Sequence, residues 1–439
     1  MKNYTTPVVE ISPDVGDLWA EVDLGIIGQN TRAVRSVLNE GTRLAAVVKG
    51  DGYGHGSFAV AREAQRNGAT DTVVSTVMEG VELRLQGLEG PVLVMGAVSP
   101  GQADLVVSKD LSPIVFTDET AVALSEAALQ MDTQVRVHLK IDTGLSRYGV
   151  AVGDAVDFMD RSASLEGLVW EGVCTHLARS FVPNDRMTQV QAERFRFAIR
   201  GLEAAGYYFS CKHIANSAAL VSYPELEMDM VRIGNLIYGQ EPLAGSREEL
   251  AAVRPAFRLF GRITAVRDMS PGETGGYGAE FTARRPTRAA VIPAGFGDGW
   301  GVEPRTVAYR RGILLKEILR KVAERLGLDR RFFRAPNGAV QIEDQVCRIL
   351  GRVAMGQALV DVSEVAGAKP GTVAYLHCRS PLINRRVPRL YVKEGGVVGM
   401  RTVFGHVSED TSVNEGDNLT EAEVAATFQE DSPGGAEPH

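Results

Sequence analysis

The chain has 439 residues, of which 44% are hydrophobic and 23% are charged, a composition that allows a large buried core and more than one domain. Its formal net charge of -8 argues against a nucleic-acid-binding surface, which needs a basic face. No apolar run approaches the roughly 20 residues of a membrane-spanning helix, and Met1 to Gly16 lacks the features of a signal peptide, so we expect a cytoplasmic location. The four scattered cysteines form no CxxC pair, which favours reduced thiols and predicts no metal site.

The first half of the chain, to about residue 240, alternates between strand-like and helix-like patterns. After a polar tail over 1–18, Trp19–Leu24 is typical of a strand and Gly28–Leu38 of an amphipathic helix. Helical patterns follow at Phe58–Asn67, Glu79–Gln86, Glu119–Gln130, Val152–Ser162 and Asp185–Gly206. Between and beside them lie eight short β-rich runs, at Leu44–Val48, Thr72–Val77, Val92–Met95, Pro113–Phe116, Val135–Ile141, Trp170–Leu177, Lys212–Ala215 and Met230–Ile233.

Eight strands joined by segments of crossover length predict an α/β fold, a (β/α)8 TIM barrel over 19–240. A doubly wound open sheet is the structural alternative. From about Glu241 the sequence pattern changes to strand-like segments joined by Gly- and Pro-rich turns. This pattern predicts a mainly β C-terminal domain over 241–407. Within it, about 306–335 is interpreted as a helical insertion, and the acidic tail 408–439 is expected to be disordered.

Leu44–Gly56 is the most informative stretch, because an apolar run ends in Lys49 and then passes into glycines. This pattern places an amine at the carboxyl end of a strand, where the active sites of parallel α/β folds lie. A lysine desolvated there can have a lowered pKa and form a Schiff base with an aldehyde. For an isolated VVKG segment, a lysine that only marks the end of a buried strand is the commoner interpretation.

The whole segment resembles the pyridoxal 5'-phosphate (PLP) lysine motif of alanine racemases, AVVKADAYGHG, with Gly50 and Gly52 in place of two alanines. The resemblance extends from Val22 to about Val398. It implies a TIM barrel followed by a β domain, PLP as the cofactor, Lys49 as its attachment point, a small-molecule amino-acid substrate, and a homodimer with active sites shared between subunits.

His138–Gly149 resembles the racemase segment HLKVDTGMGRLG. A two-pronged guanidinium after a glycine turn can bind a carboxylate, although a lone arginine in a loop is more often a surface charge. The resemblance implies that Arg147 binds the substrate carboxylate and that Lys140, which some members carry as a carbamate, holds Arg147 in place.

Three further segments match the cofactor-binding motifs of the family. Thr175-His176 matches its THFA, and the resemblance implies that His176 packs near the cofactor ring, although a hydrogen-bonded core histidine is an equal alternative from the sequence. His213–Ser217 and Met230–Gly239 match HxANS and VRxGxxxYG, at the seventh and eighth strands, where barrels bind phosphate. By resemblance, the phosphate ligands are Ser217, Gly234, Asn235 and Tyr53. Arg232 is expected to face the pyridine nitrogen and to leave it unprotonated, because arginine holds its proton far more tightly.

In the second domain, Gly275–Thr282 resembles VSYGxxYT and singles out Tyr277. Racemisation needs two bases on opposite sides of the α carbon, so we assign Lys49 to one face and Tyr277, from the partner subunit, to the other. A phenol is a poor base at neutral pH, and this hypothesis therefore requires nearby positive charge. GRVAMGQ resembles GRVCMDQ and implies that Met355 contacts the substrate, with Gly356 in place of an aspartate. Gly371–Tyr375 resembles a GTxxY motif that makes Tyr375 another phosphate ligand.

The main hypothesis is therefore a PLP-dependent amino-acid racemase, an isomerase most similar to alanine racemase. The alternatives are a PLP enzyme of the same fold that acts on another amino acid, as a racemase, decarboxylase or aldolase, and a non-catalytic PLP-binding protein. The last is disfavoured by the second domain and Tyr277.

Overall fold

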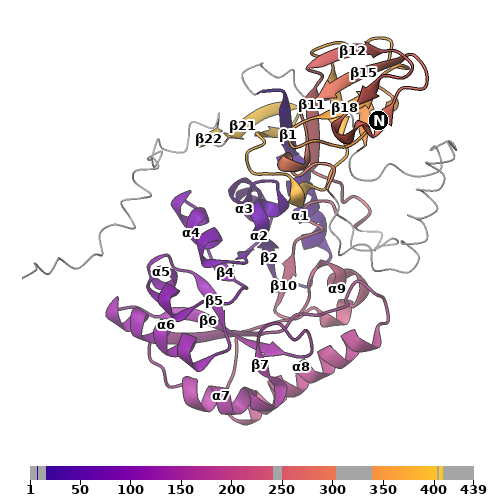
Figure 1. The fold of residues 1–439 in the computed structure, drawn as a ribbon. Coiled ribbons are helices and arrows are strands. Elements are labelled where there is room, and N and C mark those ends of the chain that lie inside the picture. Colours follow the sequence, from indigo (N-terminus) through magenta and orange to yellow (C-terminus); the bar gives the residue numbers. More distant parts are fainter. Residues whose placement is uncertain (1–6, 8–15, 241–249, 303–338, 403–404, 409–439) are drawn as a thin grey trace, which may run out of the picture.

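The computed structural model describes residues 7, 16–240, 250–302, 339–402 and 405–408. A barrel of parallel strands wrapped by helices forms one part, and a mainly β part lies beside α2 and α3 at one end of it (Figure 1). The predicted insertion (about 306–335), the predicted boundary near 241 and almost all of the predicted tails (1–18 and 408–439) lie outside the described residues, so these remain predictions.

The barrel strands are short and buried on both faces, as parallel strands covered by helices must be. Their order is β10-β2-β3-β4-β5-β6-β8-β9, with β7 paired to β6. The N–H of Arg232 donates to the carbonyl of Ala215 (3.0 Å), and that of Asp229 to Lys212 (3.1 Å). These bonds bring β9 beside β10, so the ring is nearly closed, and the barrel prediction is confirmed over the open sheet. The strands are β2 (Arg43–Val47), β3 (Asp71–Val74), β4 (Val92–Val94), β5 (Ser112–Val115), β6 (Val135–Asp142), β7 (Val150–Ala151), β8 (Leu168–Cys174), β9 (Cys211–His213) and β10 (Met230–Ile233).

The helices cover the outside of this ring (Figure 1). Several begin at a side-chain cap, and in α4 the hydroxyl of Thr76 and the carboxylate of Glu79 form a capping box. The helices are α1 (Leu24–Ser36), α2 (Lys49–Tyr53), α3 (Ser57–Arg66), α4 (Val77–Leu85), α5 (Ala103–Ser108), α6 (Asp118–Gln130), α7 (Ala155–Ser162), α8 (Arg186–Ala204) and α9 (Ser217–Ser222).

The β part is built on an eleven-stranded sheet of order β12-β15-β18-β17-β16-β19-β11-β1-β20-β21-β22. The first strand of the described chain, β1, lies inside it, antiparallel to β11 and parallel to β20. A separate pair, β13 (Thr274–Gly275) and β14 (Phe281–Thr282), flanks Tyr277. The sheet strands are β1 (Leu18–Asp23), β11 (Phe257–Arg262), β12 (Ala265–Met269), β15 (Thr287–Ile292), β16 (Val340–Ile342), β17 (Gln345–Ile349), β18 (Ala358–Asp361), β19 (Val373–Leu376), β20 (Arg389–Lys393), β21 (Gly396–Thr402) and β22 (Gly405–Ser408).

Each part has its own hydrophobic core, one centred on the barrel strands and their helices and one on the eleven-stranded sheet. Trp300 is fully buried in the second core, and its indole N–H donates to the carbonyl of His377 (3.1 Å). A search of the described helices finds no span with the length and apolar character needed to cross a bilayer.

The loop after Lys49 meets the β part at very close range. Gly54 has a φ of +84°, and a Cβ there would lie 2.0 Å from the carbonyl oxygen of Ser380, in the turn Ser380–Leu382. At Gly56 a Cβ would lie 2.0 Å from the hydroxyl of Tyr391 on β20. Glycine at both positions therefore allows the β part to pack directly on the loop.

Gly54→Ala is expected to lower the free energy of unfolding by about 3 kcal/mol, because it adds a backbone clash to left-handed strain. Gly87→Ala is the matched control, with a φ of +81° and no atom within 4 Å of the added Cβ. It should cost only about 1 kcal/mol. Urea unfolding measures both, and equal losses would contradict the close contact.

Candidate active site

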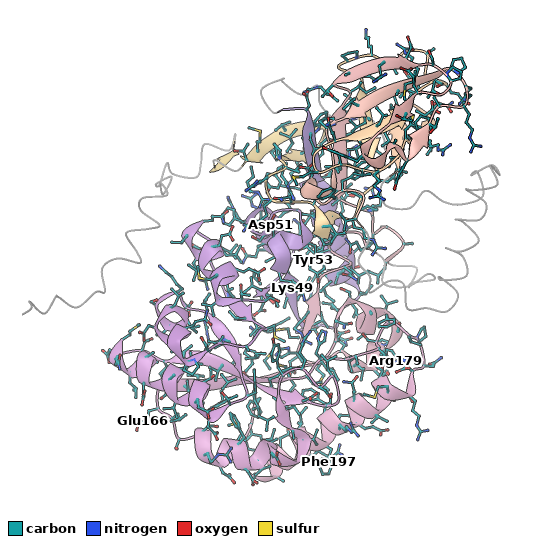
Figure 2. The ribbon with its side chains drawn as sticks, in the orientation of Figure 1. Lys49, Asp51, Tyr53, Glu166, Arg179 and Phe197 are labelled. Carbon is teal, nitrogen blue, oxygen red and sulfur yellow. The ribbon has the colours of Figure 1, made fainter. Side chains whose placement is uncertain are left out.

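A pocket of about 750 Å³ opens at the carboxyl ends of the barrel strands. Figure 2 shows Lys49 and Tyr53 at this end of the barrel, on the side that faces the β part. The pocket brings together nine of the residues predicted from the sequence: Lys49, Tyr53, Lys140, Arg147, His176, Ser217, Arg232, Gly234 and Asn235.

Lys49 directly follows β2 and Val48, as the run of apolar residues predicted. The next peptide is anchored, because the N–H of Gly50 donates to Oε1 of Glu79 (2.7 Å). Burial lowers the pKa of Lys49, and the charge of Arg147 lowers it further, while Glu79 opposes the shift. Lys49 is thus a desolvated amine with an enhanced neutral fraction.

Tyr53, Ser217 and Gly234 converge from three separate segments. The N–H of Gly234 donates to Oγ of Ser217 (3.1 Å). A Cβ at Gly234 would lie 2.8 Å from the hydroxyl of Tyr53, so only glycine leaves room for that phenol. Two hydroxyls and the backbone around Gly234 and Asn235 line one side of the pocket. Such hydroxyl and N–H groups suit the oxygens of an anion.

Arg232 lies at the base of the pocket and is only 4% exposed. Its guanidinium donates to Nδ1 of His213 (2.5 Å), to the carbonyl of Thr175 (2.9 Å) and to that of Ile214 (3.2 Å). The ring of His176 lies 3.5 Å from the same guanidinium. These acceptors are neutral groups, because burial lowers the pKa values of both histidines well below the ordinary range.

A chain of imidazoles extends from Arg232 towards the opposite end of the barrel. Since Nδ1 of His213 accepts from Arg232, its proton is on Nε2, which donates to Nδ1 of His138 (3.0 Å). Nε2 of His138 then lies 3.9 Å from the carboxylate of Glu171. Burial lowers the pKa of His138 to about 4, so this chain orients Arg232 without neutralising it.

Lys140 and Arg147 occupy another side of the pocket. Burial lowers the pKa of Lys140 to about 8; the Cys174 thiol opposes this shift and the charge of Arg232 adds to it. The turn before Arg147 is fixed by Asp142, whose Oδ1 accepts from the N–H groups of Gly144, Leu145 and Ser146 (2.9 to 3.1 Å). Arg147 lies over the ring of Tyr148, with 5.5 Å between its guanidinium carbon and the ring centroid.

The charged side chains that line the pocket in the described part of the chain are all basic. Among the described residues, its lining contains four cationic side chains and no carboxylate: Lys49, Lys140, Arg147 and Arg232. Like charges at close range in a partly buried site stabilise bound anions. The pocket is therefore suited to a ligand that carries more than one anionic group.

Three predicted residues do not line this pocket. Tyr277 is 72% exposed in the turn Tyr277–Ala279, and Met355 is 68% exposed. Both belong to one region of the β part, because Ala354 and Gln357, which flank Met355 and Gly356, line a second pocket together with Tyr277. Tyr375 lies on β19, where its ring is 5.7 Å from that of Phe260.

Sequence reasoning did not single out three groups that support the site. Glu79 could have been found, because Thr76-x-x-Glu79 is a capping-box pattern before an apolar run. His138 begins the HLK motif but its role has no local signal, and neither has Glu171, since their contact depends on the pairing of β6 with β8.

Family comparisons cover both parts of the chain. Residues 22–242 match the model "Alanine racemase, N-terminal domain", and residues 256–388 match "Alanine racemase, C-terminal domain". An alanine racemase of Symbiobacterium thermophilum is 36% identical over 375 residues, covering 85% of this chain and 96% of the relative. An alanine racemase of Desulfovibrio desulfuricans is 33% identical, with 86% and 98% covered.

The chain is also similar to solved structures of alanine racemases. Alanine racemase from Clostridium difficile 630 superposes with a TM-score of 0.77 at 26% identity, covering 88% of this chain and 98% of that one. The enzyme from Streptomyces coelicolor superposes with a TM-score of 0.72 at 27% identity, covering 87% and 100%. With both family models matched and most of each relative covered, the chain belongs to the alanine racemase family.

Proposed function

We propose that the protein is a PLP-dependent alanine racemase that interconverts the L- and D-enantiomers. The observation that carries this proposal is the pocket at the carboxyl ends of the barrel strands, where Lys49 lies with three further cationic side chains and no carboxylate of the described residues lines the pocket. The cofactor contributes a phosphate and the substrate a carboxylate, so both ligands match that charge. The family match and the names of the relatives indicate that the substrate is alanine.

The residues present fit PLP. Tyr53, Ser217, Gly234 and Asn235 would hold the phosphate, in the place where a Cβ on Gly234 would collide with the phenol. Arg232 would donate to the ring nitrogen without protonating it, and His176 would lie beside the ring. Lys49, already desolvated, would bind the aldehyde between turnovers. The proposed role of Tyr375 as a phosphate ligand rests on its GTxxY motif alone, because Tyr375 does not line this pocket.

PLP, when bound, withdraws electrons from the α carbon of the amino acid and so acidifies its α proton. Arg147, held by Lys140, would orient the substrate carboxylate, with Met355 closing the other side. Lys49 would accept the proton on one face, and the phenol of Tyr277 would return one on the other face. Lys140, Arg147 and Arg232 would supply the positive charge that a phenol needs to act as a base.

A homodimer completes the site in this proposal. Tyr277 does not line the pocket that contains Lys49, and it lies exposed in the same region as Met355. In a homodimer, each copy of the chain would place its region around Tyr277 and Met355 over the pocket of the other copy. We also propose a cytoplasmic location, which the four free cysteines of the described chain support.

The decarboxylase, aldolase and non-catalytic alternatives are less favoured, because the relatives named above are racemases over nearly their whole length. The discriminating experiment incubates each alanine enantiomer with the PLP-loaded protein in deuterated water. Chiral chromatography should find both enantiomers from either starting material, with deuterium at the α position. Loss of carbon dioxide or release of an aldehyde would reject racemisation.

Lys49→Ala is expected to abolish the visible absorbance of the bound cofactor and all racemisation, because no other amine lies at the end of β2. Lys369→Ala, on the exposed surface of the β part, is the control and should behave as wild type. Racemisation by the Lys49 variant at the wild-type rate would reject the assignment.

Tyr277→Phe is expected to slow racemisation by about 10² to 10⁴ in both directions, because one face loses its proton donor and acceptor. Proton exchange with deuterated water should continue on the other face, so one enantiomer of alanine should still gain deuterium without inverting. Equal, small effects on exchange of both enantiomers would contradict the two-base arrangement.

A heterodimer of one Lys49→Ala chain and one Tyr277→Phe chain tests whether the site is shared. Purification through two different tags isolates it from the homodimers. One of its two sites would combine an intact lysine with an intact tyrosine, so about half of the wild-type activity should return. A heterodimer as inactive as its parents would place both residues of each site on one chain.

A further inference from the structure

The turn that follows Lys49 has an unusual backbone. Gly50, Asp51, Gly52 and Tyr53 have φ values of 61°, 55°, 58° and 52°, so four successive residues are left-handed. Each non-glycine residue in this conformation costs about 1 to 2 kcal/mol. Asp51 and Tyr53 are therefore held there by their surroundings, since the turn does not favour that conformation by itself.

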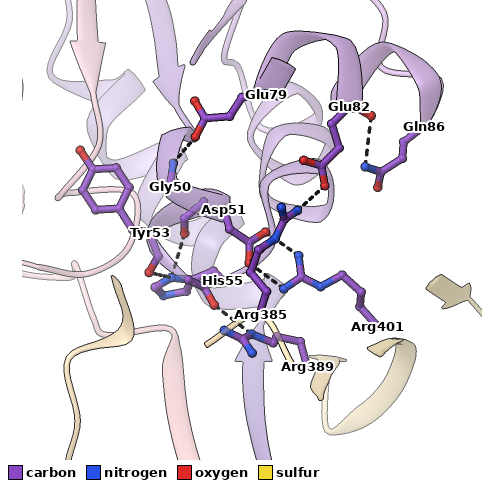
Figure 3. Close-up of polar contacts among 12 residues, drawn as sticks. Gly50, Asp51, Tyr53, His55, Glu79, Glu82, Gln86, Arg385, Arg389 and Arg401 are labelled. Atoms are coloured by element: carbon purple, nitrogen blue, oxygen red, sulfur yellow. Dashed lines mark hydrogen bonds and ion pairs between the residues drawn. The ribbon is translucent and has the colours of Figure 1, made fainter. Parts of the chain in front are cut away.

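Arginines of the β part supply a large share of those surroundings (Figure 3). Arg401, on β21, donates two hydrogen bonds to the carboxylate of Asp51, at 2.5 and 2.7 Å. Arg389, on β20, donates to the carbonyl of Gly54 (3.1 Å). Arg385 lies 3.8 Å from Asp51 and pairs with Glu82 of α4.

The ion pair between Asp51 and Arg401 is largely shielded from solvent, with side chains that are 8% and 16% exposed. A paired guanidinium and carboxylate in such a place hold a fixed, two-pronged geometry. Removing either partner leaves the other charge buried, which costs far more than loss of a surface pair. Asp51 is thus fixed in position by a strand that lies 350 residues later in the chain.

The turn also connects two functional groups. Lys49 stands at its start and Tyr53 at its end, and both line the pocket, whereas Asp51 is not part of the lining. The side chain of Asp51 points towards Arg401 (Figure 3). The first peptide of the turn is anchored from the barrel side by Glu79. The barrel and the β part therefore hold the same five residues from opposite sides.

We propose that Asp51 and Arg401 are positioning residues: through their ion pair the β part holds the left-handed turn and so sets where the amine of Lys49 and the phenol of Tyr53 enter the pocket. This inference rests on the proposed function for the roles of Lys49 and Tyr53. The alternative is that the ion pair only connects the barrel to the β part. In that case its loss would leave the geometry of the turn unaffected.

Arg401→Met is the main variant, because it keeps a long side chain and removes the charge. Its matched control is Arg258→Met, which breaks the buried pair of Arg258 and Glu21 within the β part, with side chains that are 11% and 0% exposed. Both variants lose an arginine from a buried pair, and only one pair touches the turn. Arg401→Lys tests rescue by a conserved charge.

The first measurement is hydrogen–deuterium exchange of the PLP-loaded proteins, read in peptides that span residues 49–56. Arg401→Met is expected to speed exchange there by at least about tenfold relative to Arg258→Met, and Arg401→Lys to recover part of the protection. Equal exchange in the two methionine variants would overturn the inference.

The second measurement separates cofactor binding from turnover. Arg401→Met should weaken equilibrium binding of PLP and lower kcat by at least about tenfold, since small displacements of a reacting group have large effects on rate. The KM for alanine should change by less than about threefold, because Arg147 is not part of the turn. A tether alone would lower stability and leave PLP affinity and kcat as in Arg258→Met.

Asp51→Asn alone covers the case in which Arg401→Met does not fold, since it breaks the same ion pair and should likewise speed exchange over residues 49–56 and weaken PLP binding; where both variants fold, a double-mutant cycle tests whether the pair acts as a unit. Asp51→Asn keeps a residue that tolerates the left-handed region and removes the charge. If the pair acts as a unit, Asp51→Asn combined with Arg401→Met should be no worse than either single variant in exchange and in PLP binding. Additive losses would overturn the inference.

Failure of this inference and failure of the proposed function give different results. If the wild type does not racemise alanine but Arg401→Met still exposes residues 49–56 to exchange, the proposed function fails and the positioning of the turn stands. If the wild type racemises alanine and the turn is unaffected, only the inference fails.

Discussion

The site depends on one steric constraint, the direct packing of the β part on the loop between Lys49 and Gly56. Side chains at Gly54 and Gly56 would collide with the backbone of Ser380 and with the hydroxyl of Tyr391. Without these contacts, Arg389 and Arg401 could not reach the turn, and its left-handed residues would have only the barrel to hold them. The second half of the chain is therefore part of the support of a lysine that lies in the first eighth.

The second organising feature is positive charge that the pocket does not neutralise. Arg232 is oriented by carbonyls and neutral imidazoles, and Lys140 and Arg147 face the same space. Burial disfavours the charged forms of Arg232 and Lys140, so a bound anion would stabilise both. Affinity for ligands with a phosphate and a carboxylate follows from this electrostatic imbalance, before any specific contact is considered.

The sequence allowed much of this to be predicted, for identifiable reasons. The barrel strands are short, β-rich runs between helical patterns, so the eight predicted runs lie within a few residues of the observed strands. Nine pocket residues follow local motifs at strand ends, where the fold forces side chains together. The pairing of Asp51 with Arg401 and the chain from Arg232 to Glu171 could not be predicted, because they join segments whose proximity exists only in the tertiary structure. The role of Tyr277 stays a prediction, since it concerns a second copy of the chain.

The place of β1 has a consequence for how the polypeptide matures on the ribosome. This strand is made before the barrel, yet its two neighbours, β11 and β20, are made after the entire barrel. Trp19, Ala20 and Val22, which are fully enclosed in the finished molecule, must therefore remain without their sheet partners during most of synthesis. Chaperone capture of this apolar segment, and slow final docking, are the expected consequences of pairing a strand made before the barrel with strands made after it.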